Sequence, residues 1–368
     1  MKDIIEFNGI SHLVDFAPYY SGKNIMLVTG KDSYESSGAK AVCEQILASE
    51  RCIRFSDFSV NPKLSDAIKG CEIARENNVD FIIAVGGGSV LDTAKLIKAL
   101  FRSGGNELET ATGAERVIDP KIPIIAIPTT AGSGSEATHF AVVYVGEEKY
   151  SLASKCLEPD SVILDGSLAT SGNEYLKICN GLDAMAQAIE SYWAVGATDE
   201  SRHYARSALK LGWETFPKYT SVNCSSIDAQ KMIEAANLAG KAINISKTTA
   251  AHAWSYAFTS GFAVPHGHAV WLTLPKIFQL HFQYLRNGQE KSNDTMLELV
   301  NLLNLDQNKM LDKQLEDFLV ALRIAETAEK LDISSKDRIR LSTKVNMQRM
   351  ANNPVQFTEK DIREIFAI

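Results

Sequence analysis

The chain of 368 residues lacks several features that would assign it to a common functional class. No apolar run approaches the ~20 residues that a membrane-spanning helix needs, so we expect no membrane partner. There is no block of Lys and Arg, and the net charge is −7, which disfavours a nucleic-acid partner. The six cysteines form no Cys-x-x-Cys pair and no signal peptide is evident, so we expect free thiols and a cytoplasmic location.

The composition is that of an ordinary folded protein. Apolar residues make up 45% of the chain and charged residues 23%, which argues against global disorder. The length exceeds what one ordinary hydrophobic core accommodates and predicts two domains.

Short apolar runs alternate with amphipathic stretches up to about residue 165. This alternation predicts parallel strands joined by crossover helices. Strands are expected at residues 24–29, 51–58, 80–85, 122–127 and 161–164, helices at 35–49, 62–78 and 89–102, and a hairpin turning at Gly146, Glu147 and Glu148.

Beyond about residue 170 the strand patterns fade and helical periodicity takes over. Helices are expected at residues 174–195, 199–217, 226–244, 248–259 and 295–350. We therefore predict an α/β N-terminal domain over residues 1–167 and an all-helical C-terminal domain over residues 168–368.

Two loops in the α/β part follow buried strands and are rich in glycine and hydroxyl groups. The first, Gly86-Gly87-Gly88-Ser89, opens a helix whose N–H groups suit a pyrophosphate, although a plain strand-to-helix turn has the same residues. The second, residues 128–136, contains Thr129, Thr130 and Ser133. Because open α/β sheets bind ligands at the carboxyl ends of their strands, the two loops could hold one dinucleotide cofactor.

The helical part contains a set of residues suited to a divalent metal such as Fe²⁺ or Zn²⁺. Asp183 and Gln187 are four residues apart on a predicted helix, as are His252 and Tyr256, and His266 follows in Pro-His-Gly-His. Spacing alone leaves a hydrogen-bonded structural role open for each histidine.

Four ordered segments give this chain its resemblance to a known family. They are GGGSVLDTAK at 86–95, PTTAGSGSEAT at 128–138, GLDAMAQAIESYWA at 181–194, and PHG at 265–267 with a histidine 14 residues upstream of His266. In these segments the chain resembles the iron-containing (metal-dependent, group III) alcohol dehydrogenases, whose architecture is also that of dehydroquinate synthase. The resemblance implies a Rossmann-like dinucleotide-binding domain followed by a helical metal- and substrate-binding domain.

The resemblance also implies roles for individual residues. Asp183, His252 and His266 match metal ligands. The positions that match cofactor contacts are Gly87, Gly88, Ser89, Asp92, Thr129, Thr130, Ser133 and Lys149.

Three positions depart from the family pattern. Gln187 stands where a fourth ligand, a histidine, is expected, and an amide oxygen binds metal more weakly than an imidazole. Tyr256 stands where a histidine often relays a proton or contacts the cofactor. Gly30 replaces the acid that would hold the adenosine ribose, and Lys31 follows it, which favours NADP(H) over NAD(H) because a 2′-phosphate would meet attraction instead of repulsion.

The surroundings of the predicted ligands favour an anionic substrate. Lys247, Arg202 and His268 could form a pocket for it, unless Lys247 points to solvent as most lysines do. The segments QAIESYW, NISKTTAAHAWSY and PHGHAV resemble a subgroup of phosphonate metabolism that reduces phosphonoacetaldehyde to 2-hydroxyethylphosphonate.

The expected mechanism is hydride transfer from NAD(P)H to an aldehyde whose oxygen the metal polarises, with Tyr256 or His268 supplying a proton. If Gln187 prevents metal binding, His252, His266 and Lys247 would polarise the carbonyl, as in metal-free maleylacetate reductases. The sequence is also compatible with a general short-chain alcohol dehydrogenase, a dehydroquinate-synthase-like lyase or a catalytically silent dinucleotide-binding protein. Family analogy suggests a homodimer or larger assembly.

Overall fold

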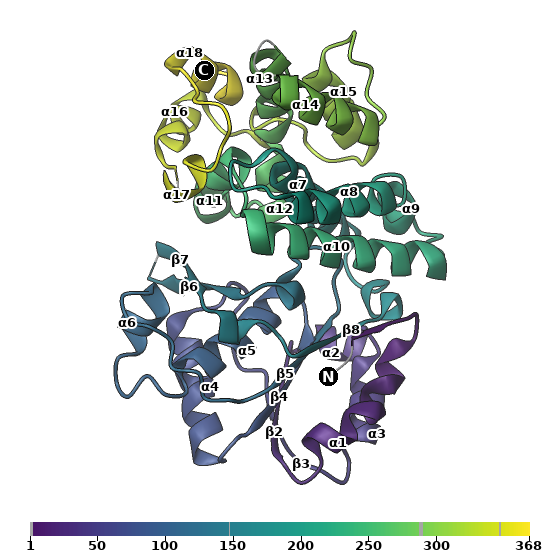
Figure 1. Cartoon of the computed structure of the whole chain (residues 1–368), viewed down its shortest axis with the longest axis vertical. Helices are drawn as coiled ribbons and strands as arrows, with labels where there is room; N and C mark the ends of the chain where they lie inside the picture. The colour runs from purple at the N-terminus through teal and green to yellow at the C-terminus, as the bar shows by residue number, and fades with distance from the viewer. Residues whose placement is uncertain (1–2, 147, 287–289, 346) are drawn as a thin grey trace. The chain divides into compact units, whose positions relative to one another are not determined.

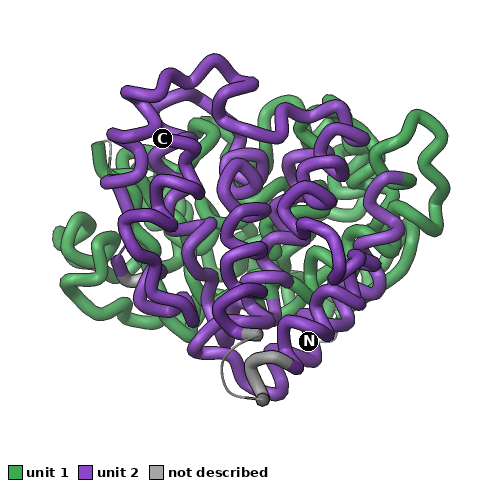
Figure 2. Tube along the Cα trace, turned by 90° about the horizontal axis from the view of Figure 1, so that it is seen from above, with its two compact units in different colours: residues 1–177, 218–240 green, residues 178–217, 241–368 purple. Residues whose placement is uncertain are grey.

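The computed structural model describes residues 3–146, 148–286, 290–345 and 347–368, which form two compact units (Figure 2). The first unit contains residues 1–177 and 218–240, and the second contains residues 178–217 and 241–368. The predicted turn residue Glu147 lies outside the described residues. The predicted domain boundary after residue 167 stays a prediction.

The first unit is built on a six-stranded sheet whose hydrogen-bonded pairs are all parallel (Figure 1). The strand order is β1-β8-β5-β4-β2-β3. The strands are β1 (Ile4–Ile5), β2 (Asn24–Thr29), β3 (Arg51–Phe55), β4 (Phe81–Gly86), β5 (Ile124–Pro128) and β8 (Ser161–Leu164). An antiparallel hairpin of β6 (Phe140–Val145) and β7 (Glu148–Ala153) stands apart from this sheet.

The strands form where the sequence has short runs of branched apolar residues. Successive side chains of β4 point to opposite faces, and every residue of the strand is buried because helices cover both faces. On one face, Ile83 and Val85 belong to a core cluster with Leu27, Ile125 and Ile127. This burial on both sides explains why the strands lack the alternating polar residues of a half-exposed sheet.

The strand order creates a switch point beside β2. From β2 the chain continues to β3 on one side, then crosses to β4 on the other side of β2. Thr29 pairs with Val85, so the carboxyl ends of β2 and β4 are adjacent. Ligands of doubly wound sheets bind at such a point.

The helices of the first unit confirm the predicted alternation with the strands. They are α1 (Ala17–Tyr20), α2 (Ser33–Ser36), α3 (Ala39–Ile46), α4 (Leu64–Glu76), α5 (Gly88–Leu100) and α6 (Glu107–Thr112). The sequence analysis missed β1 and α6, which have two and six residues and are too short to show a clear period.

Helices make up the regular structure of the rest of the chain, and the described residues after 165 contain no strand. They are α7 (Glu174–Trp193), α8 (Asp199–Gly212), α9 (Phe216–Thr220), α10 (Ser226–Ser246), α11 (Ala250–Phe262), α12 (His266–Trp271), α13 (Leu274–Arg286), α14 (Glu290–Leu302), α15 (Leu311–Ala321), α16 (Ser335–Thr343), α17 (Met347–Met350) and α18 (Glu359–Phe366). The predicted fold class, an α/β part followed by a helical part, is confirmed.

The helical region predicted at residues 295–350 is interrupted. Asn304, Arg323 and Asp332 adopt left-handed backbone conformations with φ of 52°, 59° and 57°, which an α-helix cannot continue through. The helical periodicity of the sequence continues across these three residues. The sequence therefore predicted a helical region but not the positions where its helices end.

None of the described helices is both long enough and apolar enough to cross a bilayer. All six cysteines are free thiols.

Candidate active site

The glycine-rich turn of the first unit joins β4 directly to α5. Because α5 begins at Gly88, its first N–H groups lie at the switch point and are available to an anion. A Cβ atom at Gly86 would lie 2.4 Å from Val90, and one at Gly88 would lie 2.6 Å from Ser133 Oγ. Glycine is therefore required here because the neighbouring side chains occupy the space of a Cβ.

The second predicted loop lies against the first. The N–H of Thr129 donates to the carbonyl of Gly86 at 3.1 Å, and a Cβ at Gly87 would lie 3.3 Å from Thr130. Thr129 Oγ1 is buried and has no hydrogen-bond partner among the described residues. An orphaned hydroxyl beside a helix N-terminus fits a polar ligand such as a dinucleotide.

Asp92 is enclosed by the protein. Its carboxylate accepts from Ser135 Oγ at 2.5 Å and from the N–H of Val142 at 3.1 Å. Burial raises the pKa of Asp92, and the charges of Lys95 and Lys149 oppose that shift. The structure thus shows Asp92 supporting the second loop, while its predicted cofactor contact, like that of Lys149, stays a prediction.

Lys95, one turn further along α5, is fully buried beneath the same loop. Its ammonium group donates to the carbonyl and hydroxyl of Thr138 at 2.8 and 3.0 Å, to the carbonyl of Phe140 at 3.0 Å, and to both oxygens of Ser135. Burial lowers the pKa of Lys95 to about 8. One lysine therefore fixes Ser135 at the end of the second loop and two residues that follow it.

Cations gather at the end of β2, where Gly30 replaces the expected acid. Arg54 donates to Thr29 Oγ1 at 2.8 Å and to the carbonyl of Gly30 at 3.1 Å. Lys31 forms an exposed ion pair of 3.1 Å with Asp57, which offsets part of its charge. The structure thus adds Arg54, which the sequence analysis missed, to the cations at the end of β2.

Asp183, His252 and His266 come together in the second unit, from α7, α11 and α12. Their potential ligand atoms all lie within 4.8 Å of one another. His252 Nε2 is 3.2 Å from Asp183 Oδ1, and His266 Nε2 is 3.9 Å from the same oxygen. One carboxylate and two imidazoles facing a common point form a donor set that fits Fe²⁺ or Zn²⁺.

The close approach of α12 to α7 depends on Gly267. A Cβ atom at this position would lie 1.9 Å from the carbonyl oxygen of Cys179 and 2.8 Å from the N of Asp183. Any other residue would move His266 away from Asp183. The Pro-His-Gly motif thus combines a ligand with the small residue that positions it.

A fully buried carboxylate, Glu190, holds His252 in place. One oxygen of Glu190 accepts from Thr249 Oγ1 and from the N–H of Ala251, both at 2.8 Å, and the other bonds His252 Nδ1. Burial would raise the pKa of Glu190, but His252 and the hydrogen bonds outweigh that effect and lower it. Because the carboxylate accepts a hydrogen bond from Nδ1–H, Nε2 is left to face Asp183 as a potential ligand atom.

The second histidine is held in a similar way. Ser255 Oγ donates to the carbonyl of His252 at 2.9 Å, so its oxygen can accept from His266 Nδ1 at 3.4 Å. Tyr256 stacks on the ring of His266 with centroids 5.8 Å apart and an interplanar angle of 5°. The phenol of Tyr256 therefore lies next to a predicted metal ligand.

The remaining predicted residues differ in how close they come to this group. Gln187 is buried one turn after Asp183 on α7, and its role as a fourth ligand stays a prediction. The structure does not bring Arg202 and His268 into the group: Arg202 Nε donates to the carbonyl of Tyr192 at 3.2 Å, and His268 Nε2 bonds the carbonyl of Ala325 at 2.7 Å. Lys247 is half-buried, and burial and a neighbouring arginine lower its pKa to about 8.

Sequence reasoning missed several residues of this network. Glu190 follows Asp183 by seven positions, so its place on the same helix face was visible, but its full burial and its bond to His252 were not. Thr249 and Ser255 carry no pattern that separates them from other hydroxyl residues. Arg349 is the arginine that lowers the pKa of Lys247. It lies 97 positions from His252, too far along the chain for any spacing argument.

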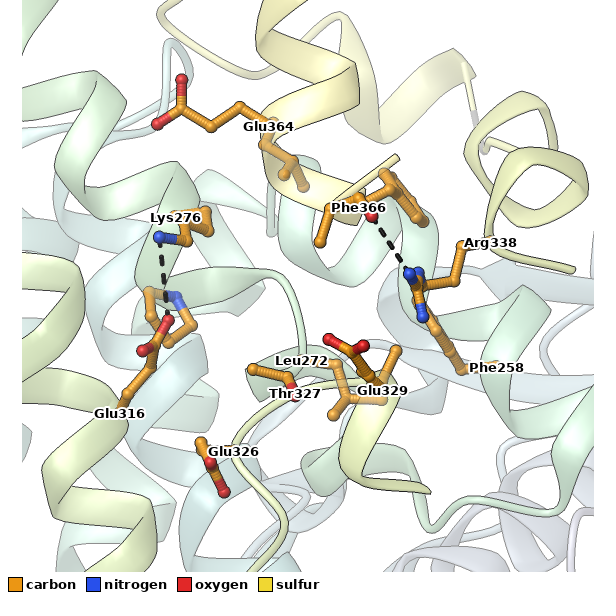
Figure 3. Close-up of a pocket in the computed structure, with 14 residues that line it drawn as sticks. Phe258, Leu272, Lys276, Glu316, Glu326, Thr327, Glu329, Arg338, Glu364 and Phe366 are labelled. Carbon is orange, nitrogen blue, oxygen red and sulfur yellow. Dashed lines mark hydrogen bonds and ion pairs between the residues drawn. The ribbon is translucent and has the colours of Figure 1, made fainter. Parts of the chain in front are cut away.

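A separate hollow among the C-terminal helices contains none of the predicted site residues (Figure 3). Four glutamates line it together with Lys276 and Arg338. Lys276 is paired with Glu316 at 3.8 Å, and Arg338 donates to the carbonyl of Ala367 at 3.1 Å. The cations there serve the packing of the helices.

Comparison with known proteins shows that both parts of the chain match one family. The sequence profile of iron-containing alcohol dehydrogenase matches residues 4–166, and the profile of the C-terminal part of the Fe-containing alcohol dehydrogenase family matches residues 177–368. The chain is 32% identical to the probable alcohol dehydrogenase EutG of Escherichia coli over 60% of its length, and this match spans 56% of that relative. It is 28% identical to a long-chain-alcohol dehydrogenase of Geobacillus thermodenitrificans, over 85% of this chain and 80% of that one.

Solved structures share the whole architecture. The sulfoacetaldehyde reductase of Bifidobacterium kashiwanohense, crystallised with NAD⁺, superposes with a TM-score of 0.89 at 25% identity and covers 100% of this chain and 96% of its own. An alcohol dehydrogenase of Oenococcus oeni has the same fold, with a TM-score of 0.89 at 22% identity, covering 100% of this chain and 98% of its own. Since family profiles match both the α/β and the helical parts, this chain belongs to the iron-containing alcohol dehydrogenase family, an oxidoreductase family.

Proposed function

We propose that this protein is a metal-dependent, NAD(P)H-linked aldehyde reductase that acts on a small anionic aldehyde and also catalyses the reverse alcohol oxidation. The observation that carries the proposal is the group of Asp183, His252 and His266, with Glu190 and Ser255 holding the far nitrogens of the two histidines. Such support is typical of a working metal site, because it orients each imidazole before the metal arrives.

The residues divide the chemistry between them. When bound, a divalent metal supplies Lewis-acid polarisation of the aldehyde oxygen, and a reduced nicotinamide supplies the hydride. Asp183, His252 and His266 would hold the metal. The N-terminus of α5, from Gly88, and Thr129 bind and orient the dinucleotide. Tyr256, stacked on His266, is placed to give a proton to the oxygen of the product.

The cofactor preference follows from the end of β2. Gly30, Lys31 and Arg54 favour the 2′-phosphate of NADP(H), whereas Asp57 weakens that preference by pairing with Lys31. The NAD⁺ complex of the similar sulfoacetaldehyde reductase supports NAD(H). We therefore propose a nicotinamide dinucleotide as cofactor and expect measurable rates with both forms.

The proposed substrate is phosphonoacetaldehyde, reduced to 2-hydroxyethylphosphonate. Its support is the half-buried Lys247 a few residues before His252, together with the anionic substrate in the name of the similar sulfoacetaldehyde reductase. A general short-chain alcohol dehydrogenase is the second candidate, because the similar EutG is named a probable alcohol dehydrogenase. The six free cysteines suit a reducing compartment such as the cytoplasm.

The test is oxidation of NADPH and NADH at 340 nm with phosphonoacetaldehyde, and with propanal as the neutral control. Each reaction is run with purified protein, after chelation, and after addition of Fe²⁺ or Zn²⁺. We expect turnover that chelation abolishes and metal restores. Turnover that survives complete metal removal would instead support a metal-free mechanism, and no turnover with any aldehyde would contradict the proposed function.

A further inference from the structure

The loop between α10 and α11 holds Lys247 in an unusual backbone conformation. Its φ is 64°, in the left-handed region that residues with a side chain rarely occupy. Asn352 fixes this conformation because its side-chain amide donates to the carbonyls of Ser246 at 2.8 Å and of Thr248 at 3.0 Å, on either side of Lys247. These two hydrogen bonds hold the backbone of Lys247 in this conformation.

A second cation, Arg349 of α17, approaches the same loop. Its guanidinium donates to Thr248 Oγ1 and lies 5.7 Å from the centre of the Tyr256 ring. Burial, and then the positive charge of Arg349, lower the pKa of Lys247 to about 8. Arg349 therefore brings a second positive charge to this loop, near Lys247.

Arg349 lies one aromatic ring away from the predicted ligands, and Lys247 lies five residues before His252 in the chain. The guanidinium of Arg349 lies over the ring of Tyr256, and this ring stacks on that of His266. All these residues belong to the second unit, so the arrangement does not depend on the position of the first. A short molecule could therefore place one end at the cations and the other at the ligands.

We propose that Lys247 and Arg349 bind the dianionic head group of the aldehyde whose carbonyl is reduced beside Asp183, His252 and His266. This inference rests on the proposed function and adds the group that selects the substrate. The guanidinium offers paired donors and the ammonium a compact charge, a combination that matches a tetrahedral oxyanion. Because two cations meet the head group, a phosphonate with two charges binds more tightly than a sulfonate with one.

The test compares kcat and KM for phosphonoacetaldehyde, sulfoacetaldehyde and propanal in the wild type and in Arg349→Met and Lys247→Met. For each variant we expect the KM for phosphonoacetaldehyde to rise about 10- to 100-fold, the typical effect of losing a charge-assisted hydrogen bond. The rise is smaller for sulfoacetaldehyde, and kcat/KM for propanal, which has no anionic head group, falls least of the three. Arg349→Lys restores part of the loss, and Arg340→Met, an exposed arginine of α16, serves as the matched control.

A binding measurement keeps the inference testable without turnover. Methylphosphonate is expected to raise the melting temperature of the wild type and to have a weaker effect on Arg349→Met. If Arg349→Met fails to fold, Thr248→Val takes its place in the test. This variant removes only the hydroxyl that accepts the hydrogen bond from Arg349, and we expect a smaller reduction of the effect of methylphosphonate on the melting temperature.

The outcomes separate the two proposals. If the wild type reduces propanal but shows no preference for either anion, the function stands and the inference is overturned. Equal losses on all three aldehydes in both variants would also overturn it, because they would show a role in folding or in the reaction centre. If no aldehyde is reduced but methylphosphonate protects only proteins with both cations, the function fails and the anion site remains.

Discussion

The two candidate sites of this protein are built in different ways. The dinucleotide site of the first unit consists mainly of backbone at the ends of neighbouring strands, where Gly86 and Gly88 leave room for other groups. The metal site of the second unit consists of side chains from separate helices, each held by buried partners such as Glu190. A backbone site depends on a continuous stretch of sequence, whereas a side-chain site depends on residues that only the fold brings together.

The comparison predicts its largest effect at a shared ligand. Asp183→Asn keeps the shape of the side chain but removes the charge that both histidines face. We expect loss of bound metal and a fall in kcat/KM of about 10³-fold, because the polarisation of the aldehyde oxygen is lost. Metal analysis and NAD(P)H oxidation measure both effects. Asp199→Asn, an exposed carboxylate of α8, is the control, and full metal content in Asp183→Asn would refute the assignment.

A smaller loss is expected when only a supporting residue changes. Glu190→Gln keeps the volume of the side chain but removes the carboxylate that accepts the hydrogen bond from His252 Nδ1–H. Metal affinity, measured by titration against a competing chelator, should fall about 10- to 100-fold. Glu298→Gln, which alters a partly exposed ion pair with Arg206 in the same unit, should leave that affinity unchanged. Unchanged affinity in Glu190→Gln would show that the histidines need no such support.

A substitution at Gly267 tests whether the metal site also depends on the close backbone contact between α12 and α7. Gly267→Ala places a Cβ against the carbonyl of Cys179, and we expect the free energy of unfolding to fall by ~1–3 kcal/mol. Gly261→Ala is the matched control, because its Cβ would meet nothing within 4 Å and should raise the free energy of unfolding by ~0.5–1 kcal/mol. Chemical denaturation measures both. Equal stability of the two variants would mean that α12 can shift without penalty.

The smallest effect is expected at the backbone site. Thr129→Val removes one hydroxyl among several donors, so the Kd for the dinucleotide should rise about 3- to 10-fold in a fluorescence titration. The free energy of unfolding should stay the same or increase, because Thr129 Oγ1 is buried with no partner among the described residues. A less stable protein with unchanged affinity would mean that this hydroxyl serves the fold.

This contrast explains how much the sequence could predict. The strands β2 and β4 and the turn between β4 and α5 were predicted nearly to the residue, since apolar runs and glycines record them locally. The group of Asp183, His252 and His266 followed from motifs of the family. The sequence could not show that Glu190 and Lys95 are fully buried, because the segments that cover them are distant in the chain.

The anion-binding residues show the same limit. Lys247 was identified from its place near His252, but Arg349 reaches Thr248 only through the packing of α17 on α11. Arg202 and His268 bond backbone carbonyls, and their predicted role at the substrate anion stays a prediction. Distance along the chain therefore could not identify Arg349.

The path of the chain has a consequence for exchanging parts between related enzymes. Residues 218–240 return to the first unit, where Gly134 packs against Gly240 and the N–H of Gly166 donates to Gln230 at 2.8 Å. A gene fragment that ended near residue 177 would leave these surfaces bare and would be expected to aggregate. Functional chimaeras would need to carry residues 218–240 together with the N-terminal fragment, so recombination that respects this fold needs crossover points at three places, after residues 177, 217 and 240, rather than one.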